Sequence, residues 1–181
     1  MKAMKDPAAA TSDQGRDRLL DELLNHRDSV LCLCLGYARD PVQAEELAQE
    51  AYLKALKSVG SLKDHRAAKV WLCRIAKHTC LDHLKRERIG REAVKDCGPR
   101  TIEDRSPETL VLEREQRQLI KRSIQRLPRK LRDVFIMREY AELTYEEIAR
   151  VLGRRIGTVM SRLNRARRAL AGLVREEEHG T

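Results

Sequence analysis

The sequence predicts an all-α fold made of two small helical domains joined by a flexible linker. Its 181 residues include only 9 glycines and 5 prolines, so few positions interrupt a helix. The aromatic residues, one Trp, one Phe and four Tyr, are too few for a typical β-sandwich or barrel. Apolar residues recur at the spacing of amphipathic helices through most of the chain. The length suits one domain or two small ones.

The N-terminal domain is predicted at residues 16–90, after a disordered tail at residues 1–15. Its second helix begins at Asp40-Pro41, because a capping side chain stands before a proline at the first helical position. A longer helix is expected at residues 66–88. Trp71 shares the apolar stripe of that helix, so we assign it to the core rather than to base stacking.

The C-terminal domain is predicted at residues 106–176, after a linker at residues 91–105 and before a tail at residues 177–181. Four helices are expected in it. Its third helix begins with a capping box, in which the Thr144 hydroxyl and the Glu147 carboxylate satisfy free backbone amides of the first turn.

The segment 144–168 has the form of a helix-turn-helix. Gly153 stands where a left-handed turn residue is required. The second helix is predicted to bury Ile156, Val159, Leu163, Ala166 and Leu170. Its opposite face carries side chains suited to base edges in the major groove, which are Met160, Ser161, Asn164, Arg165 and Arg168. Its start and flanks carry side chains suited to phosphates, which are Arg155, Thr158, Arg162 and Arg167.

The net charge of +9 is concentrated in two basic segments. Residues 63–91 hold nine Lys and Arg against three acids, and residues 150–175 hold eight Arg and no acid. Two such segments indicate two contacts with one polyanion. The acidic stretch at residues 40–50 indicates a further, different partner.

Several classes of protein are disfavoured by what the sequence lacks. No apolar run approaches the roughly 20 residues of a membrane span, and no signal peptide is recognisable, so we expect a cytoplasmic protein without direct membrane insertion. Five cysteines, an odd number, argue against a disulfide framework.

The sequence also lacks the motifs of a metal site or an enzyme. We expect no cofactor and no metal; a zinc or redox role for Cys32, Cys34, Cys73 and Cys80 is the less favoured alternative. No P-loop, Gly-x-Ser-x-Gly or His-Glu-x-x-His is present, so we expect no enzyme.

Five motifs resemble those of one family. LPRKLRDVF from Leu127, LTYEEIA from Leu143 and GTVMSRLNRAR from Gly157 resemble region 4 of bacterial sigma factors. QAEELAQEAYLKA from Gln43 resembles region 2.2, and VWLCRIAKHT from Val70 resembles regions 2.3 and 2.4. The order of the motifs and the short length are similar to the extracytoplasmic-function sigma factors.

This resemblance implies a protein that binds core RNA polymerase, recognises −35 and −10 promoter elements and promotes DNA opening. Polymerase contacts with a coiled coil of the largest subunit map to Glu45, Glu46, Gln49, Glu50 and Leu53, and the polymerase flap is a second expected partner. Single-stranded −10 DNA maps to the long third helix, through Lys69, Arg74, Lys77, His78, Lys85, Arg86 and Arg88. Region 4 would bind double-stranded −35 DNA. An anti-sigma factor is a further expected partner.

Three positions depart from the pattern of many family members. His78 stands where many have Asn, and it would add charge below about pH 6.5 if its pKa were ordinary. Gln43-Ala-Glu-Glu replaces Asp-Ala-Glu-Asp, which alters polymerase contacts in detail. Met160 replaces Lys or Arg, so the −35 preference of relatives does not transfer.

Two other functions stay open on the sequence alone. The first is a helix-turn-helix regulator that binds duplex DNA without polymerase, with residues 16–90 as a sensor or dimerisation bundle. The second is a basic RNA-binding protein, which is disfavoured because no exposed aromatic cluster accompanies the arginines.

Overall fold

The computed structural model of the chain describes residues 21–62, 64–93 and 108–179. Within these residues every regular element is helical, as predicted, and residues 21–24 are helical as well. The elements are α2 (Arg27–Tyr37), α3 (Pro41–Ser58), α4 (Ala68–Ala93), α5 (Glu108–Arg126), α6 (Arg129–Glu139), α7 (Tyr145–Leu152) and α8 (Ile156–His179), with 3₁₀ turns at Val59–Ser61 and His65–Ala67. The expected helix start at Ser106-Pro107 lies outside the described residues.

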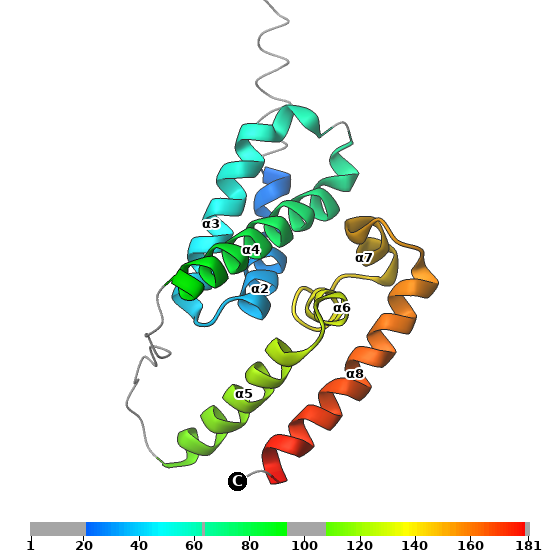
Figure 1. Cartoon of the computed structure of the whole chain (residues 1–181). Coiled ribbons are helices and arrows are strands. Elements are labelled where there is room, and N and C mark those ends of the chain that lie inside the picture. The colour runs from blue at the N-terminus through cyan, green and yellow to red at the C-terminus, as the bar shows by residue number, and fades with distance from the viewer. Residues whose placement is uncertain (1–20, 63, 94–107, 180–181) are drawn as a thin grey trace, which may run out of the picture.

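The N-terminal half, residues 21–93, packs α2, α3 and α4 against one another (Figure 1). The predicted start of α3 is confirmed, because the Asp40 side chain accepts a hydrogen bond from the Gln43 backbone N–H at 2.8 Å and Pro41 follows it. Apart from Leu47, the buried residues of α3 are small and let its neighbours approach closely; they are Ala44, Ala48, Ala51 and Ala55.

Helix α4 is longer than the predicted 66–88 and runs from Ala68 to Ala93. A short 3₁₀ turn replaces its expected first residues. Its Leu72, Cys73 and Ala76 are fully buried, whereas Trp71 is half-buried at the edge of the core. The prediction that Trp71 belongs to the core is therefore confirmed only in part, because its side chain packs against the core but is not fully buried.

The C-terminal half, residues 108–179, contains the predicted helix-turn-helix. Both hydrogen bonds of the capping box are present, from Glu147 N–H to Thr144 Oγ1 at 3.2 Å and from Thr144 N–H to Glu147 Oε2 at 2.8 Å. Gly153 ends α7 in the left-handed conformation with φ 61°. The signals read from the sequence thus account for both ends of α7.

One predicted core residue of the helix-turn-helix is exposed. Val159, Leu163 and Ala166 are buried, as expected, but Ile156 is 41% exposed. Ile156 is the first residue of α8 and precedes the turns that face α6 and α7, so its side chain borders the turn instead of the core.

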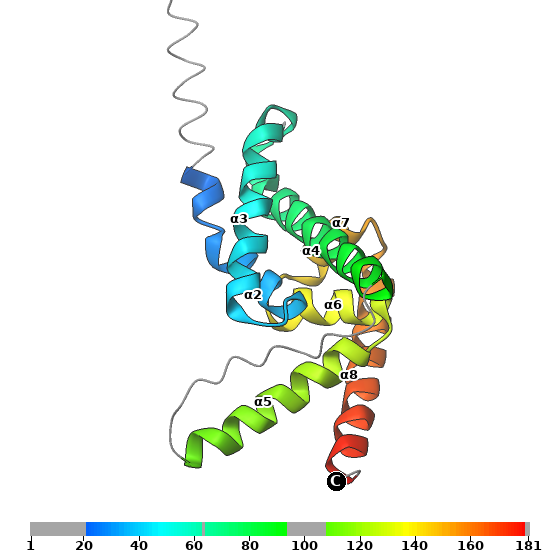
Figure 2. The ribbon, with the colours of Figure 1, turned by 60° about the vertical axis from the view of Figure 1, so that its left-hand side comes forward.

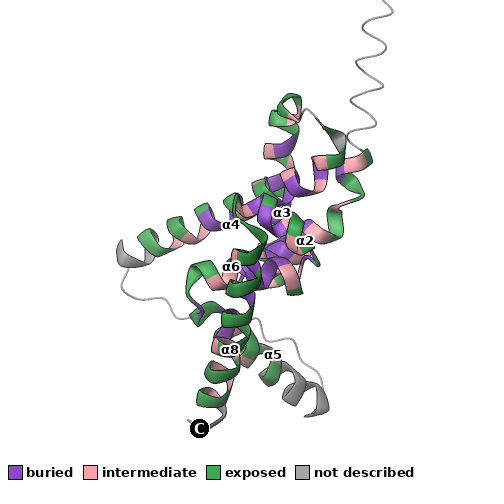
Figure 3. Ribbon diagram, turned by 90° about the vertical axis from the view of Figure 1, so that its right-hand side faces the viewer, coloured by how far each residue is buried: buried purple, intermediate pink, exposed green. Residues whose placement is uncertain are grey.

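The two halves share one continuous core, which the prediction of two linked domains did not anticipate. Helices α6 and α7 pack against α2 and α4 of the N-terminal half, while α5 and α8 extend away from it (Figure 2). Buried residues accordingly gather where α2, α3, α4 and α6 meet (Figure 3). Among the described residues, no helix combines the length and apolarity needed to cross a membrane.

Thr144→Ala should lower the stability of the chain by about 1 kcal/mol, because it removes the N-cap acceptor of α7. Thr144→Ser, which keeps the hydroxyl, should stay close to the wild type. Urea unfolding followed by circular dichroism measures both. Equal stability of the alanine and serine variants would contradict a role of the cap in holding α7.

Candidate nucleic-acid and partner interfaces

One outward stripe of α3 carries most of the predicted polymerase-binding residues. Glu45, Glu46, Gln49 and Leu53 recur three and four residues apart, so they share one face of the helix, and all four are exposed. Leu53 is 58% exposed, which is unusual for a large apolar side chain that no other element covers. The stripe combines acidic charge with apolar area.

Two further apolar residues, which were not predicted to bind polymerase, extend this stripe. Val42 and Leu56 are also exposed and lie on the same face. Their helical spacing from Leu53 is a signal that could have found them. We call Val42, Glu45, Glu46, Gln49, Leu53 and Leu56 the α3 stripe.

Glu50 lies beside the α3 stripe rather than in it. It is partly exposed, and its carboxylate contacts Lys54 Nζ at 2.8 Å and Arg86 of α4 at 3.6 Å. Its charge is therefore already engaged within the chain, which distinguishes it from the other residues predicted to bind polymerase.

The outer face of α8 carries the predicted base-reading residues. Met160, Ser161, Asn164, Arg165 and Arg168 are all exposed. Arg165 Nη2 donates to Ser161 Oγ at 3.1 Å, so its guanidinium lies along this face. We call these five residues the α8 face.

The predicted phosphate contacts flanking the α8 face differ among themselves. Arg155 is exposed, whereas Thr158 and Arg162 are half-buried. Arg167 donates to Glu139 of α6 at 2.7 Å, and this hydrogen bond raises the pKa of its guanidinium above the usual range. Arg167 is thus turned toward α6.

A hollow of about 650 Å³ lies between the first turns of α6 and α8. It is lined by Thr158, Ser161, Arg162 and Arg165 together with Lys130 and three neighbouring residues of α6 and α8. Lys130 is exposed and was not predicted to bind DNA. Its place beside four predicted DNA-binding residues adds a cation to the start of the α8 face.

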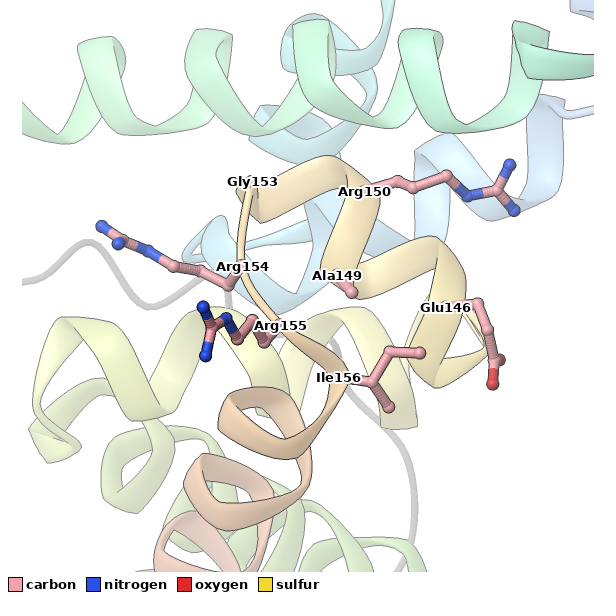
Figure 4. Close-up of a pocket in the computed structure, with 7 residues that line it drawn as sticks. All are labelled: Glu146, Ala149, Arg150, Gly153, Arg154, Arg155 and Ile156. Carbon is pink, nitrogen blue, oxygen red and sulfur yellow. The ribbon is translucent and has the colours of Figure 1, made fainter.

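A second hollow, of about 410 Å³, lies at the turn between α7 and α8 (Figure 4). Ala149 and Ile156 form part of its wall. Arg154 and Arg155 extend to one side of the turn, and Arg150 extends to the other (Figure 4). The exposed Ile156 is therefore part of a cationic surface at the helix-turn-helix.

The lysines and arginines of α4 that are predicted to bind −10 DNA fall into two groups. Lys85, Arg86 and Arg88, in its later turns, are exposed. Lys85 contacts Asp82 at 3.4 Å, and Arg86 contacts Glu50, as described above. Both ion pairs are solvent-exposed, so they hold these cations weakly and leave them able to exchange partners.

The earlier cations of α4 contact the C-terminal half instead. Lys69 Nζ lies 3.3 Å from Glu147, and Lys77 Nζ lies 3.8 Å from the Asp133 carboxylate. Arg74 Nη2 donates to the backbone carbonyl oxygen of Arg150. We call these three side chains the proximal α4 cations.

The pKa of His78 is lowered from its usual value. Partial burial is the largest cause, and the nearby charges of Lys77, Arg74 and Arg129 act in the same direction against the opposing effect of Asp82. His78 therefore gains its charge at lower pH than an ordinary histidine, so it is less charged near pH 6.5 than its type alone suggests.

The cysteines lie mainly in the core. Cys34, Cys73 and Cys80 are buried, and the Sγ atoms of Cys34 and Cys80 lie 3.7 Å apart. Burial raises the pKa of Cys73 to about 12, which keeps it a neutral thiol. In the described ranges, no group of three or more His, Cys, Asp or Glu residues is arranged to hold a metal ion.

Comparisons with known proteins identify the family of the chain. Sigma-70 region 2 matches residues 23–89, and Sigma-70 region 4 matches residues 117–170. The RNA polymerase sigma-H factor of Pseudomonas aeruginosa is 34% identical over 167 residues, which span 87% of this chain and 86% of that protein. The ECF RNA polymerase sigma-E factor of Escherichia coli is 36% identical over 136 residues, spanning 69% of this chain and 70% of that protein.

Two solved structures share the fold of the chain. The sigma factor RpoE, in complex with the anti-sigma factor NepR from Bartonella quintana, has a TM-score of 0.64 at 22% identity, over 90% of this chain and 97% of that one. CnrH, in complex with the cytosolic domain of CnrY, has a TM-score of 0.65 at 18% identity, over 92% and 94%. The match of residues 23–89 to region 2 disfavours a regulator that acts without polymerase, because such a regulator would use the helix-turn-helix alone.

Proposed function

Because the chain belongs to the extracytoplasmic-function sigma factors of RNA polymerase, we propose that its three exposed surfaces divide the work of promoter recognition. The α3 stripe binds the core enzyme, and the α8 face reads the −35 element. The proximal α4 cations, together with Lys85, Arg86 and Arg88, hold single-stranded −10 DNA. Factors of this family initiate transcription and are not enzymes. The polymerase supplies the chemistry of RNA synthesis.

The observation that carries this division of roles is the α3 stripe. It presents Leu53, Val42 and Leu56 to solvent on the same face as Glu45 and Glu46. Exposed apolar side chains supply the buried area of an interface, and carboxylates beside them select a basic partner. This chemistry fits a basic coiled coil of the largest polymerase subunit.

The α8 face suits the major groove of duplex −35 DNA. Arg165 and Asn164 offer donors to base edges, and Met160 offers apolar contact to a thymine methyl group. Arg155, Arg162 and Lys130 flank these residues, where phosphates would pass. Arg167 is the exception, because it would have to leave Glu139 before it contacts a phosphate.

Helix α4 suits the non-template strand of the −10 element. Single-stranded DNA requires cations along its backbone and room for unstacked bases. Lys85, Arg86 and Arg88 are exposed for such contacts in the described conformation. The proximal α4 cations would join them once the C-terminal half moves away.

The same surfaces define the partners and the place of action. Core polymerase contacts the chain through its coiled coil and, at the C-terminal half, through its flap. An anti-sigma factor that covers the α3 stripe would block the first of these contacts. We place the protein in the cytoplasm, on the nucleoid when bound to polymerase, or held at the membrane by an anti-sigma factor.

Leu53→Glu should weaken binding to sigma-free core polymerase by roughly 10- to 100-fold, because it puts a charge into the apolar part of the α3 stripe. Leu24→Glu is the matched control: Leu24 is 60% exposed but lies outside the stripe, so its substitution should leave the affinity unchanged. Fluorescence anisotropy with labelled chain measures both. Equal affinities of the two variants would count against the α3 stripe as the polymerase-binding surface.

A further inference from the structure

Two buried thiols meet where α2 packs against α4. Cys34 of α2 and Cys80 of α4 are both fully buried, and the Cys80 thiol donates a weak hydrogen bond to Cys34 Sγ, with 3.7 Å between the two sulfur atoms. Cys73, the neighbouring buried cysteine of α4, forms no hydrogen bond with another thiol of the described residues. The fold therefore brings one particular pair of its buried cysteines into contact.

The distance between the two sulfur atoms suits the formation of a disulfide. At 3.7 Å they are already in contact, so no other side chain has to leave the space between them. A disulfide has an S–S distance of about 2.05 Å, so the two atoms must approach by roughly 1.7 Å more. Each Sγ atom turns about a single χ1 bond, so rotation of the two side chains and a small shift of the helices share this movement.

We propose that Cys34 and Cys80 are a reversible oxidation site, at which hydrogen peroxide converts the two thiols into a disulfide that joins α2 to α4. In the first step one sulfur, as its thiolate, attacks a peroxide oxygen; the O–O bond breaks, a sulfenic acid forms, and hydroxide leaves as water with the released proton. In the second step the other sulfur attacks the sulfenic sulfur, the S–O bond breaks, and a second water leaves. Two thiols and one peroxide thus give one disulfide and two waters.

Burial of the pair makes the first step slow. The hydrogen bond with Cys34 and burial raise the pKa of Cys80 far above its usual range, whereas peroxide reacts with the thiolate. Peroxide gains access when α2 opens locally. This helix spans only 11 residues, contains Gly36, and within the described part of the chain has no capping hydrogen bond from the side chain of His26. The site therefore responds to sustained rather than brief oxidation.

The disulfide stabilises the part of the chain that carries the α3 stripe. Cys34 and Cys80 are 46 residues apart in sequence, and the segment between them contains all of α3. A cross-link restricts the unfolded chain more than the folded one, so it favours the folded state. A dithiol reductant reverses the reaction by thiol–disulfide exchange, in which it becomes a disulfide and the two thiols are restored. This chemistry is independent of the polymerase and DNA contacts proposed above.

Peptide mapping after oxidation tests the pairing directly. The full-length chain is treated with hydrogen peroxide under native conditions, its remaining thiols are blocked with N-ethylmaleimide in denaturant, and tryptic peptides are analysed by mass spectrometry without reduction. Trypsin separates Cys73 from Cys80, because cleavage sites lie between them. The chain carries Cys32→Ser, because residue 32 shares a tryptic peptide with Cys34. We expect the peptides of Cys34 and Cys80 joined with loss of two hydrogen atoms, and Cys73 recovered as a blocked thiol.

Three results of the mapping would overturn the proposal. The first is blocked free thiols at both Cys34 and Cys80 after prolonged treatment with peroxide. The second is a sulfinic or sulfonic acid at either position with no disulfide, because the neighbouring thiol should trap the sulfenic acid first. The third is a disulfide from Cys34 to Cys73 as the main product, because it would show that the contact with Cys80 does not direct the reaction.

Thermal unfolding followed by circular dichroism measures the effect of the disulfide. Oxidation should raise the unfolding midpoint of the wild-type chain by about 5–10 °C, and dithiothreitol should reverse the rise. Cys80→Ala should lose the rise. Its matched control is Cys73→Ala, which makes the same change at another buried cysteine of α4 and should keep the rise. No rise in the wild-type chain, or a rise that persists in Cys80→Ala, would contradict a stabilising link between α2 and α4.

Discussion

Holoenzyme assembled with Arg165→Ala should transcribe a −35-dependent promoter about 10- to 100-fold less than the wild type, since a bidentate base contact contributes roughly 1–3 kcal/mol. Arg165 is exposed on α8 and lies against Ser161, so its guanidinium already points along the face that would enter the groove. No described buried contact depends on it, so the loss reflects recognition and not folding.

The control for this variant is Arg122→Ala. Arg122 is an exposed arginine of α5 that pairs with Glu177, away from the α8 face. Its substitution makes the same chemical change and should leave transcription close to the wild-type level. Affinity for core polymerase should be unchanged in both variants. Normal transcription by Arg165→Ala would exclude Arg165 from −35 recognition.

Leu163→Ala should lower the free energy of unfolding by about 2–5 kcal/mol, because it leaves a cavity where α8 packs on α6 and α7. Leu163 is almost completely buried, and Val159 and Ala166 flank it on the same stripe. The loss is large relative to the total stability of a small domain, so recognition of the −35 element should fail as well.

Met160→Ala is the control on the same helix. Met160 is 47% exposed, so its truncation should change stability by less than about 0.5 kcal/mol. Urea unfolding monitored by circular dichroism compares the two variants. If Leu163→Ala were as stable as Met160→Ala, the assignment of the two faces of α8 would be wrong.

Local signals in the sequence predicted the local structure well. Asp40-Pro41 capped α3, Thr144 and Glu147 formed the capping box, and Gly153 took the left-handed turn, because each of these depends on residues a few positions apart. The helical spacing also placed the exposed residues of α8 on one face. The prediction that Ile156 is buried was wrong, because the spacing of apolar residues does not reveal whether the first residue of a helix faces the core.

The contact between the two halves, such as the hydrogen bond from Tyr37 of α2 to Asp133 of α6, could not be predicted from short stretches of sequence. Tyr37 and Asp133 are 96 residues apart in sequence, and nothing in either neighbourhood identifies the other as a partner. The pairing of Arg167 with Glu139 could not be predicted for the same reason, since it spans two helices, and the role of Arg167 as a phosphate contact stays a prediction. The sequence did offer one signal: residues 134–137 are four consecutive apolar residues, so this helix needs covering on more than one side, and all four are buried in the structure.

Reconstituted transcription tests the central claim most directly. The chain is mixed with purified sigma-free core polymerase and a library of supercoiled promoter fragments, and transcript starts are sequenced. We predict starts that share two upstream motifs and are absent without the chain. An absence of starts together with no binding to core polymerase would contradict the proposed division of roles among α3, α4 and α8.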